Sequence, residues 1–365
     1  MKVERLETAV YRVPCDRPEG DGTLAWDSTT VVVVEAVADS DRRGLGFTYG
    51  SAAAAAVVKG VLEGEVTGRP PGEVRQVWEG MVRAVRNLGR PGIASTAISA
   101  VDLALWDLHG KALDQPLFRL LGARRNAVRA YGSGGFTTYT TDQLVEQLGG
   151  WVEQGMSAVK MKIGVDRGRC PELDLERVAA VRRAIGPSPK LFVDANGAYS
   201  RKQAIGLGAR LQELGVSYFE EPVSSDQFSD LAAVRRALPM DVAAGEYGYD
   251  PWYFERMLQA GAVDVLQADV SRCLGVTGWL EGASLAHARG LPFSAHCCPS
   301  LHLHAACAAP EIAHVEYFWD HVRLESMLFE GAVTADSDGK LRPAADRPGL
   351  GLELKRAEAE RWRVG

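Results

Sequence analysis

Residues 190–222 read KLFVDANGAYSRKQAIGLGARLQELGVSYFEEP, and this stretch contains one repeat of a larger pattern. Its two ends, KLFVDAN and VSYFEEP, are short apolar runs that finish in charged or turn-forming residues, which predicts two β-strands. Between them, RKQAIGLGARLQELG is amphipathic and predicts an α-helix. A strand, a helix and a second strand in this order form the unit from which parallel sheets are built.

The same rhythm continues in both directions along the chain. Six further short runs are expected to be strands, namely VRAYGSG (128–134), AVKMKIG (158–164), DVAAGEY (241–247), VDVLQAD (263–269), LPFSAHC (291–297) and HVEYF (314–318). Eight strands with helices between them, about 20–35 residues apart, are typical of a TIM-like barrel. A doubly wound open sheet is the alternative, and it is disfavoured because no Gly-rich phosphate motif opens the series. We therefore predict an α/β fold with a barrel over residues 126–345.

The first third of the chain is organised differently. Apolar runs near the start and at 29–38 predict two strands, which are joined by CDRPEGDGTLAWDS at 15–28. This connection is long and rich in Pro, Gly and Asp, so we expect a lid loop, with a disordered surface excursion as the alternative. Apolar residues at three- and four-residue steps between Ser95 and Lys111 predict a helix. We expect an α+β capping domain over residues 1–125, and a helical segment over residues 346–365 that packs back on it.

Composition and charge disfavour several classes of function. The net charge of −6 and the pI near 5.7 argue against nucleic acid, which is bound by basic surfaces. No stretch has the ~20 apolar residues of a membrane span, and the N-terminus lacks the apolar core of a signal peptide. The six cysteines form no CxxC pair or zinc-like spacing, which indicates reduced thiols in a cytoplasmic protein. The neighbours Cys297 and Cys298 are interpreted as packing residues.

Ionisable residues stand at the C-terminal ends of seven of the predicted strands. In chain order they are Lys160 and Lys162, Asp194, Glu220, Glu246, Asp269, His296 and Glu316. The two lysines point to the same side, because side chains alternate along a strand. Barrels carry their catalytic residues at this end of the strands. We therefore predict an active site at the C-terminal mouth of the barrel.

Three of these residues predict a metal site. Asp194, Glu220 and Glu246 follow three consecutive strands and together offer carboxylate oxygens, which are the ligands that Mg²⁺ prefers. The alternative is a structural network of ion pairs with Lys160, Lys162 or Arg272. Magnesium is favoured, because such a network leaves neighbouring acids repelling one another and a dication relieves that repulsion.

A second pair of residues predicts an acid/base group. Asp269 and His296 follow adjacent strands, so the carboxylate can orient the imidazole and hold its tautomer. The histidine is expected opposite Lys162, across the metal. The other histidines, at positions 302, 304, 314 and 321, have no predicted partner and are interpreted as structural.

Taken together, the motifs resemble those of one known group of enzymes. They are SAVDLALWDLHGKALDQPLFRLLG (99–122), KMK (160–162), DAN (194–196), FEEP (219–222), AGE (244–246), QAD (267–269), SAHC (294–297) and HVEYF (314–318). The chain resembles the enolase superfamily, specifically its mandelate racemase subgroup within the mandelate racemase/muconate lactonizing enzyme family, over nearly its whole length. The resemblance implies a modified TIM barrel, (β/α)7β, with an N-terminal capping domain. It also implies one Mg²⁺ per active site, bound by the three carboxylates.

The resemblance implies roles for the other residues at the mouth. Lys162 would act as one acid/base with Lys160 as its electrostatic partner, and the Asp269–His296 pair would act from the opposite face of the substrate. Glu316 would hydrogen-bond a carboxylate oxygen of the substrate. Asn196 would support the metal site.

The expected reaction starts with removal of the proton α to a carboxylate, which gives an ene-diolate that a divalent ion stabilises. The resemblance favours β-elimination of water from an acid sugar to a 2-keto-3-deoxy acid. Racemisation or epimerisation of a 2-hydroxy acid such as mandelate is the alternative, and an inactive metal-bound ligand sensor is a remote one. The cycloisomerase subgroup is disfavoured, because its members carry a lysine near the sixth strand where this chain has QADVSR (267–272).

The expected partner is a small-molecule carboxylate, and the resemblance favours a sugar acid. Polar groups suited to its hydroxyls are expected at the mouth, and the candidates are Tyr131, Ser133, Thr137, Tyr247 and Tyr249. Trp26 would contribute from the lid. The resemblance also implies a homo-oligomer, from dimer to octamer.

Overall fold

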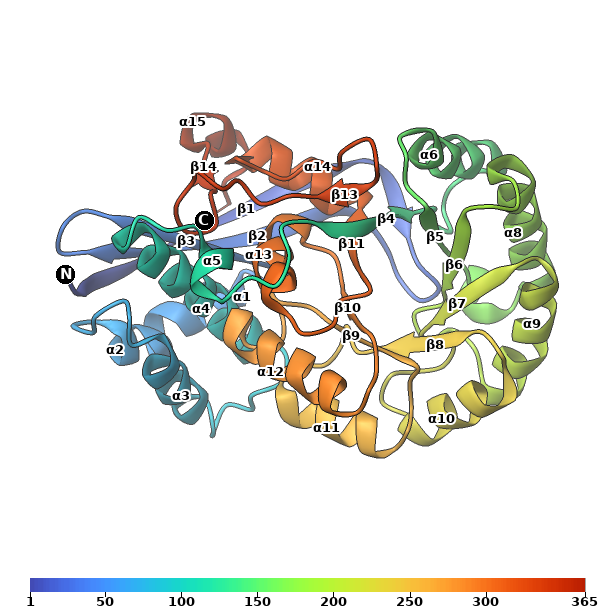
Figure 1. The fold of residues 1–365 in the computed structure, drawn as a ribbon, viewed down its shortest axis with the longest axis horizontal. Coiled ribbons are helices and arrows are strands. Elements are labelled where there is room, and N and C mark those ends of the chain that lie inside the picture. Colours follow the sequence, from blue (N-terminus) through green and yellow to red (C-terminus); the bar gives the residue numbers. More distant parts are fainter. Residues whose placement is uncertain (365) are drawn as a thin grey trace.

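The computed structural model describes residues 1–364, and a closed parallel barrel dominates it (Figure 1). Eight strands follow one another around the barrel in chain order, and the last pairs with the first, with Val315 beside Ala130. The strands are β4 (Val128–Gly134), β5 (Ala158–Lys162), β6 (Lys190–Asp194), β7 (Val216–Glu220), β8 (Asp241–Ala244), β9 (Val265–Ala268), β10 (Phe293–Ala295) and β11 (His314–Phe318). The predicted TIM-like barrel is confirmed, and its closure leaves none of these eight strands at a free sheet edge.

Helices on the outside connect each strand to the next (Figure 1). They are α6 (Thr141–Glu153), α7 (Val165–Gly168), α8 (Pro171–Ile185), α9 (Arg201–Glu213), α10 (Phe228–Ala237), α11 (Pro251–Gln259), α12 (Gly275–Ala288) and α13 (Pro299–Ala308). Local sequence sets several of their starts. Thr140, for example, accepts a hydrogen bond from the backbone N–H of Gln143 while the Gln143 side chain accepts one from Thr140, which is a capping box. The eighth strand is also followed by a helix, α14 (Trp319–Leu328).

The inside of the barrel is filled in layers. At the N-terminal end of the strands, the floor, the aromatic rings of Tyr131, Phe192 and Tyr218 pack together with Ala158 and Val265. Because side chains alternate along a strand and rise about 6.6 Å per two residues, the inward residues of the next layers lie nearer the mouth. The barrel is therefore a packed core whose chemistry changes from the floor to the mouth.

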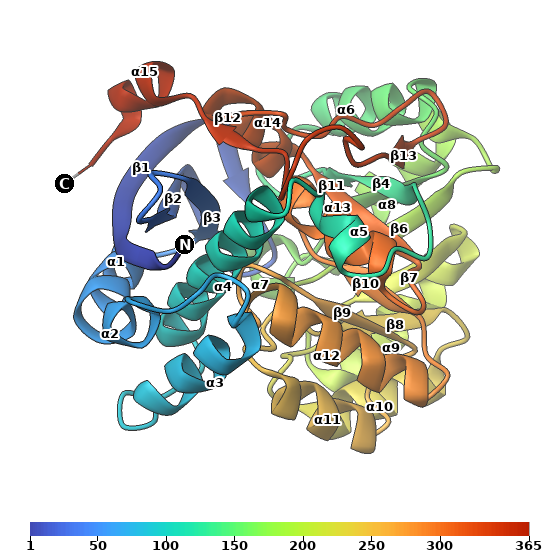
Figure 2. The ribbon, with the colours of Figure 1, turned by 60° about the vertical axis from the view of Figure 1, so that its left-hand side comes forward.

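The cap is a three-stranded antiparallel sheet with helices packed on it (Figures 1 and 2). Its strands are β1 (Val3–Gly20), β2 (Ala25–Ala38) and β3 (Arg43–Tyr49). Its helices are α1 (Ala53–Val57), the π-helix η1 (Val58–Leu62), α2 (Glu63–Val66), α3 (Val74–Ala84), α4 (Ile93–Ala112) and α5 (Leu117–Leu120). Helix α4 lies between the sheet and the barrel and contacts α12, where Asp102 accepts hydrogen bonds from the backbone and hydroxyl of Thr277.

The prediction that residues 15–28 form a loop is wrong, because most of this segment lies in strands β1 and β2. Strands β1 and β2 continue through this region, and their ladder is interrupted at residues 15–18 and at the tip, where the N–H of Asp21 donates to the carbonyl of Leu24. A register shift between Pro14 and Glu19 accommodates Pro18, the one proline of this segment. The result is a long hairpin that runs from the cap to the barrel mouth (Figure 1).

The C-terminal segment returns to the cap (Figure 2). Residues 346–364 contain β14 (Glu353–Leu354), α15 (Arg356–Ala359) and the 3₁₀-helix η2 (Glu360–Trp362), so the segment predicted to be helical is helical only in part. Two short strands precede it: β12 (Phe329–Glu330) pairs with β14, and β13 (Lys340–Leu341) pairs with β4 of the barrel. Arg356 pairs with Glu35 of β2, and the N–H of Val364 donates to the carbonyl of Val10 in β1. Within residues 1–364, no helix has the length and apolar character needed to cross a membrane.

Candidate active site

The ionisable side chains predicted at the strand ends all meet at the mouth of the barrel. They are Lys160, Lys162, Asp194, Glu220, Glu246, Asp269, His296 and Glu316, and each is at most 5% exposed. Strand register brings them together, because Lys162, Asp194 and Glu220 are directly aligned on three neighbouring strands. This is the end of the barrel at which catalytic groups gather.

The candidate metal ligands are Asp194, Glu220 and Glu246, which come from β6, β7 and the residues just beyond β8. One oxygen from each carboxylate lies within 4.8 Å of the others. Burial raises the pKa of Glu220 well above its usual range, and repulsion from Asp194 adds to the effect although Lys160 opposes it. A hard dication relieves this repulsion, and three carboxylates leave room for water or substrate around Mg²⁺. The donor set therefore fits a Mg²⁺ site.

The lysines form the ion-pair network that was the alternative to a metal site. Lys160 Nζ lies 2.6 Å from Glu220 and 2.9 Å from Glu316, and Lys162 contacts Asp194. These ion pairs do not neutralise the negative charge of the site. Six buried carboxylates, Asp194, Glu220, Glu221, Glu246, Asp269 and Glu316, surround three permanent cations, Lys160, Lys162 and Arg272. The excess of negative charge supports a dication in addition to the network.

The Asp269–His296 pair has the geometry expected of an oriented base. Asp269 Oδ2 lies 2.7 Å from His296 Nδ1, and Asp269 Oδ1 is held by the backbone N–H and the hydroxyl of Ser271, both at 2.7 Å. His296 Nε2 consequently points away from Asp269, 3.1 Å from Glu246. Burial lowers the pKa of His296, but Glu246 and Asp269 outweigh it and hold the pKa at about 10.

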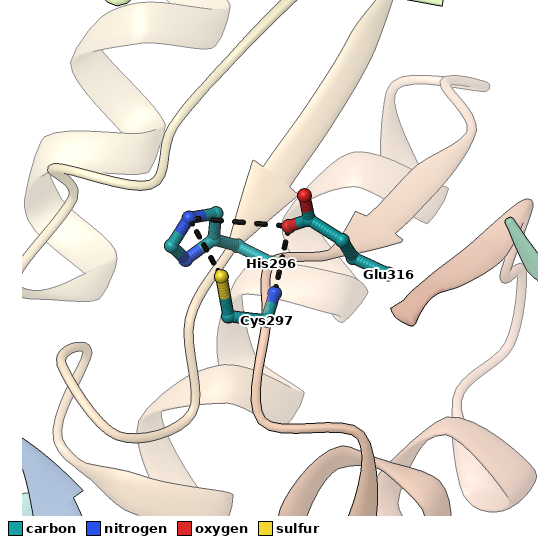
Figure 3. Close-up of side chains that lie close together, drawn as sticks. All are labelled: His296, Cys297 and Glu316. Carbon is teal, nitrogen blue, oxygen red and sulfur yellow. Dashed lines mark hydrogen bonds and ion pairs between the residues drawn. The ribbon is translucent and has the colours of Figure 1, made fainter. Parts of the chain in front are cut away.

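Glu316 is fixed from three sides. Its Oε1 accepts a hydrogen bond from the Ser133 hydroxyl at 2.5 Å and pairs with Lys160, while its Oε2 accepts the backbone N–H of Cys297 at 2.8 Å (Figure 3). Ser133, expected to contact substrate, is fully buried beneath the mouth and contacts Glu316 instead. Asn196 lies in the second layer around the carboxylates, because its Oδ1 accepts from Lys162 at 3.1 Å.

Tyr131 was predicted at the mouth, and the structure places it on the floor. It points to the same side as Ser133, as strand alternation requires, but it lies two residues earlier on β4 and therefore about 6.6 Å lower. Its ring is fully buried against Phe192, with the centroids 5.4 Å apart, and Lys160 Nζ lies 5.3 Å from the ring centroid. Alternation gives the direction of a side chain but not its depth in the barrel.

A cavity of about 630 Å³ opens beside the candidate ligands. It is lined by Thr23, Pro91, Asn196, Gly197, Glu221, Ser224, Ser225, Asp226, Tyr247, Tyr249, Asp250, Tyr253 and Arg256. Tyr247 and Tyr249 are thus placed as predicted. Trp26 is not in the lining and donates its indole N–H to Glu19, and Thr137 donates its hydroxyl to the carbonyl of Asp21 in the hairpin.

The tip of the cap hairpin closes one side of this mouth. Thr23 contributes to the cavity wall, and Gly22 is so close to the barrel that a Cβ there would lie 2.3 Å from the carbonyl oxygen of Ala195. The hairpin therefore takes the covering position that was expected of a lid, although it is built from strands.

Two residues of the site were missed in the sequence. Glu221, the second Glu of FEEP, is 1% exposed, has a left-handed backbone (φ 38°) and lines the cavity with its Oε1 unpaired. Cys297, read as a packing residue, has its Sγ 3.2 Å from His296 Nε2. Their positions directly after Glu220 and His296 were the only sequence signal, and adjacent residues in a strand normally face opposite sides.

Comparison with known proteins places this geometry in a family. The family model for the mandelate racemase/muconate lactonizing enzyme N-terminal domain matches residues 19–122, and the model described as enolase C-terminal domain-like matches residues 143–359. The chain belongs to the mandelate racemase/muconate lactonizing enzyme family. It is therefore an enzyme of the enolase superfamily, and the expected resemblance and the barrel with its N-terminal cap are both confirmed.

The proteins similar to this chain are named for different reactions. The chain is 35% identical over 300 residues to a D-galactarolactone cycloisomerase from Agrobacterium fabrum, which covers 81% of this chain and 78% of that one. A mandelate racemase/muconate lactonizing enzyme-like protein from Rubrobacter xylanophilus has a TM-score of 0.96 at 48% identity, with both chains covered completely. The L-talarate/galactarate dehydratase from Salmonella typhimurium, solved with Mg and L-lyxarohydroxamate, has a TM-score of 0.91 at 28% identity over 100% of this chain and 93% of that one.

Proposed function

We propose that the chain is a Mg²⁺-dependent acid-sugar dehydratase that removes the proton α to a carboxylate and then eliminates water. The observation that carries this proposal is the arrangement of three buried carboxylates between two oriented acid/base groups, Lys162 on β5 and His296 beyond β10. In the closed barrel, β5 and β10 are separated by three steps in one direction and five in the other, so the two groups face each other across the mouth. The dehydratase among the relatives, solved with Mg, supports both the metal and the substrate class.

In this proposal Asp194, Glu220 and Glu246 hold the ion. The ion supplies a Lewis acid that lowers the energy of the negative charge developing on the substrate carboxylate. Lys160 lies among the same carboxylates, 2.9 Å from Glu316, and keeps positive charge fixed beneath the reacting group. Fixed charges aimed at the place where charge develops stabilise the transition state more than the ground state.

Lys162 and His296 move the protons. One of them takes the α-proton, and the other, on the opposite face, donates a proton to the departing β-hydroxyl so that it leaves as water. Asp269 holds His296 through Nδ1, which turns Nε2 away from Asp269 and makes it the ring nitrogen that would face the substrate. The product is an enol that becomes a 2-keto-3-deoxy acid.

A second outcome of the same first step has specific support. The residues QADVSR disfavour the cycloisomerase subgroup, but one of the relatives bears the name D-galactarolactone cycloisomerase. Proton transfer to and from the same carbon would also give an epimer, for which a pair of bases on opposite faces is suited. All three outcomes share the removal of the α-proton, and they differ only in where the next bond breaks.

The test is a screen of mono- and diacid sugars in D₂O. Dehydration predicts 2-keto-acid formation, whereas epimerisation predicts a change in optical rotation without keto acid, and cycloisomerisation predicts consumption of a lactone. Removing metal with EDTA is expected to abolish activity, and adding Mg²⁺ is expected to restore it. Turnover that persists in EDTA contradicts the metal assignment, and the absence of α-proton exchange with every acid contradicts the proposal.

A further inference from the structure

Three side chains of different chemistry converge at the mouth of the barrel (Figure 3). His296 Nε2 lies 3.2 Å from Cys297 Sγ and 3.9 Å from Glu316 Oε2, and one ligand atom from each residue lies within 4.8 Å of the others. The three residues are at most 5% exposed. An imidazole nitrogen, a thiol and a carboxylate oxygen at these distances form a compact donor set of mixed hardness.

An unusual turn brings two consecutive residues to the same place. Cys297 has φ 52°, in the left-handed region that non-glycine residues seldom adopt. The backbone therefore leaves β10 in a sharp bend, so the Cys297 thiol lies beside the His296 ring while its N–H donates to Glu316. Backbone strain held in place by surrounding structure is frequent at functional sites.

The distances suit a tetrahedral thiophilic cation. With Zn–S near 2.3 Å and Zn–N and Zn–O near 2.0–2.1 Å, tetrahedral geometry requires about 3.6 Å between sulfur and nitrogen and about 3.3 Å between nitrogen and oxygen. The observed 3.2 Å and 3.9 Å differ from these values by amounts that side-chain rotation can remove. Glu246 Oε2 also lies 3.1 Å from His296 Nε2, but Glu246 belongs to the three-carboxylate site, so the fourth position would be taken by water.

We propose that His296, Cys297 and Glu316 form a second cation site, selective for a thiophilic divalent ion such as Zn²⁺ or Cd²⁺. It is distinct from the three-carboxylate site, which offers only the hard oxygen donors that Mg²⁺ takes. On binding, the Cys297 thiol and the protonated His296 ring each release one proton to solvent, so that sulfur binds the ion as thiolate and Nε2 binds it through its lone pair.

Occupancy of this site inhibits the enzyme. The ion engages His296 Nε2, which is the atom that faces the substrate in the proposed reaction, so the imidazole can no longer accept or donate a proton. This consequence rests on the proposed function, whereas the binding itself does not.

The binding test uses the Mg²⁺-saturated protein and Cd²⁺ as the probe. Cadmium–thiolate bonds absorb in the ultraviolet, so we expect a charge-transfer band that saturates at one equivalent. Cys297→Ser keeps the size of the side chain and the backbone N–H to Glu316, so it preserves the fold and removes only the sulfur. We expect Cd²⁺ affinity to fall by more than about 100-fold, because loss of a direct ligand costs more than loss of an outer partner.

Two other cysteines are matched controls. Cys298 is adjacent, but its Sγ faces Asp269, Ser271 and His321, so Cys298→Ser is expected to keep the band. Cys15 lies in another cluster with Glu19 and Asp320, so Cys15→Ser is expected to keep it too. A band that survives in Cys297→Ser, that disappears in either control, or that never forms in the unmodified protein overturns the proposal.

Activity supplies the second measurement. Micromolar Zn²⁺ in excess Mg²⁺ is expected to stop α-proton exchange in the unmodified enzyme and to leave exchange by Cys297→Ser unaffected. Equal inhibition of both proteins overturns the inhibitory role. If no acid undergoes exchange, the proposed function fails, and the absorbance titration still decides whether the site exists.

Discussion

On the floor of the barrel, Phe192 and Tyr218 pack against each other with their ring centroids 4.6 Å apart and their planes tilted by 31°, and they leave no charge to balance. Two residues further along the same two strands, Asp194 and Glu220 place like charges within 4.8 Å of each other and of Glu246. The backbone, the strand pairing and the degree of burial are the same at both levels. Only the chemistry of the inward side chains differs.

The difference shows how one scaffold separates stability from function. The floor gains free energy from buried aromatic area and ring geometry. The mouth is less favourable for stability, because Glu220 is buried beside other acids and its pKa is raised as a result. Conflicts of this kind are expected where a protein binds an ion or performs chemistry.

The largest expected effect compares two lysines at opposite ends of the barrel. Lys162→Ala should lower α-proton exchange by about 10²–10⁴-fold, because it removes a proposed acid/base group. Lys190→Ala, at the exposed floor end of β6, should leave exchange unchanged. Both are measured by NMR in D₂O with the acid that the screen identifies. Exchange retained by Lys162→Ala would show that the base is misassigned.

The next prediction tests the floor itself. Tyr131→Ala should lower the free energy of unfolding by about 3–5 kcal/mol through loss of a buried ring, with kcat nearly unchanged in the folded fraction. Tyr131→Phe should change neither quantity appreciably, because the hydroxyl has no hydrogen-bond partner. Urea denaturation and steady-state kinetics measure the two effects. A large drop in kcat for Tyr131→Phe would show that this residue takes part in the reaction, and the distinction between a structural floor and a functional mouth would then be wrong.

The smallest expected effect concerns the hairpin that covers the mouth. Gly22→Ala would place a Cβ against the carbonyl of Ala195. Because overpacking of this kind costs about 1–3 kcal/mol, the tip of the hairpin should move away from the barrel. We expect KM to rise about 10-fold, with a smaller change in kcat, because the tip forms part of the cavity wall. Gly64→Ala in α2, where a new Cβ meets nothing within 4 Å, is the control. An unchanged KM would mean that the hairpin does not contribute to substrate binding.

Much of the site was predictable because a parallel barrel converts chain order into spatial order. Each of the predicted ionisable residues stands at the end of a short apolar run, and parallel strands in register bring these ends to one rim. The Asp269–His296 contact follows from the same rule, since β9 and β10 are neighbours. Their proposed roles remain to be tested by the experiments above.

Other features depended on contacts that local sequence does not encode. Residues 15–28 have the composition of a loop, yet pairing between β1 and β2 overrides it. Tyr131 was assigned the correct direction and the wrong depth. Cys297 joined His296 only because the backbone there turns left-handed, which reverses the usual alternation of neighbouring side chains.

The sequence by itself determined the barrel, the cap and the set of charged residues at the mouth, because hydrophobic periodicity and strand order are local and additive signals. The tertiary structure alone decided which inward residues lie at the floor and that a hairpin covers the cavity. It alone also decided that a thiol lies 3.2 Å from His296 Nε2. These features depend on register, depth and backbone turns, which arise only when distant segments pack together.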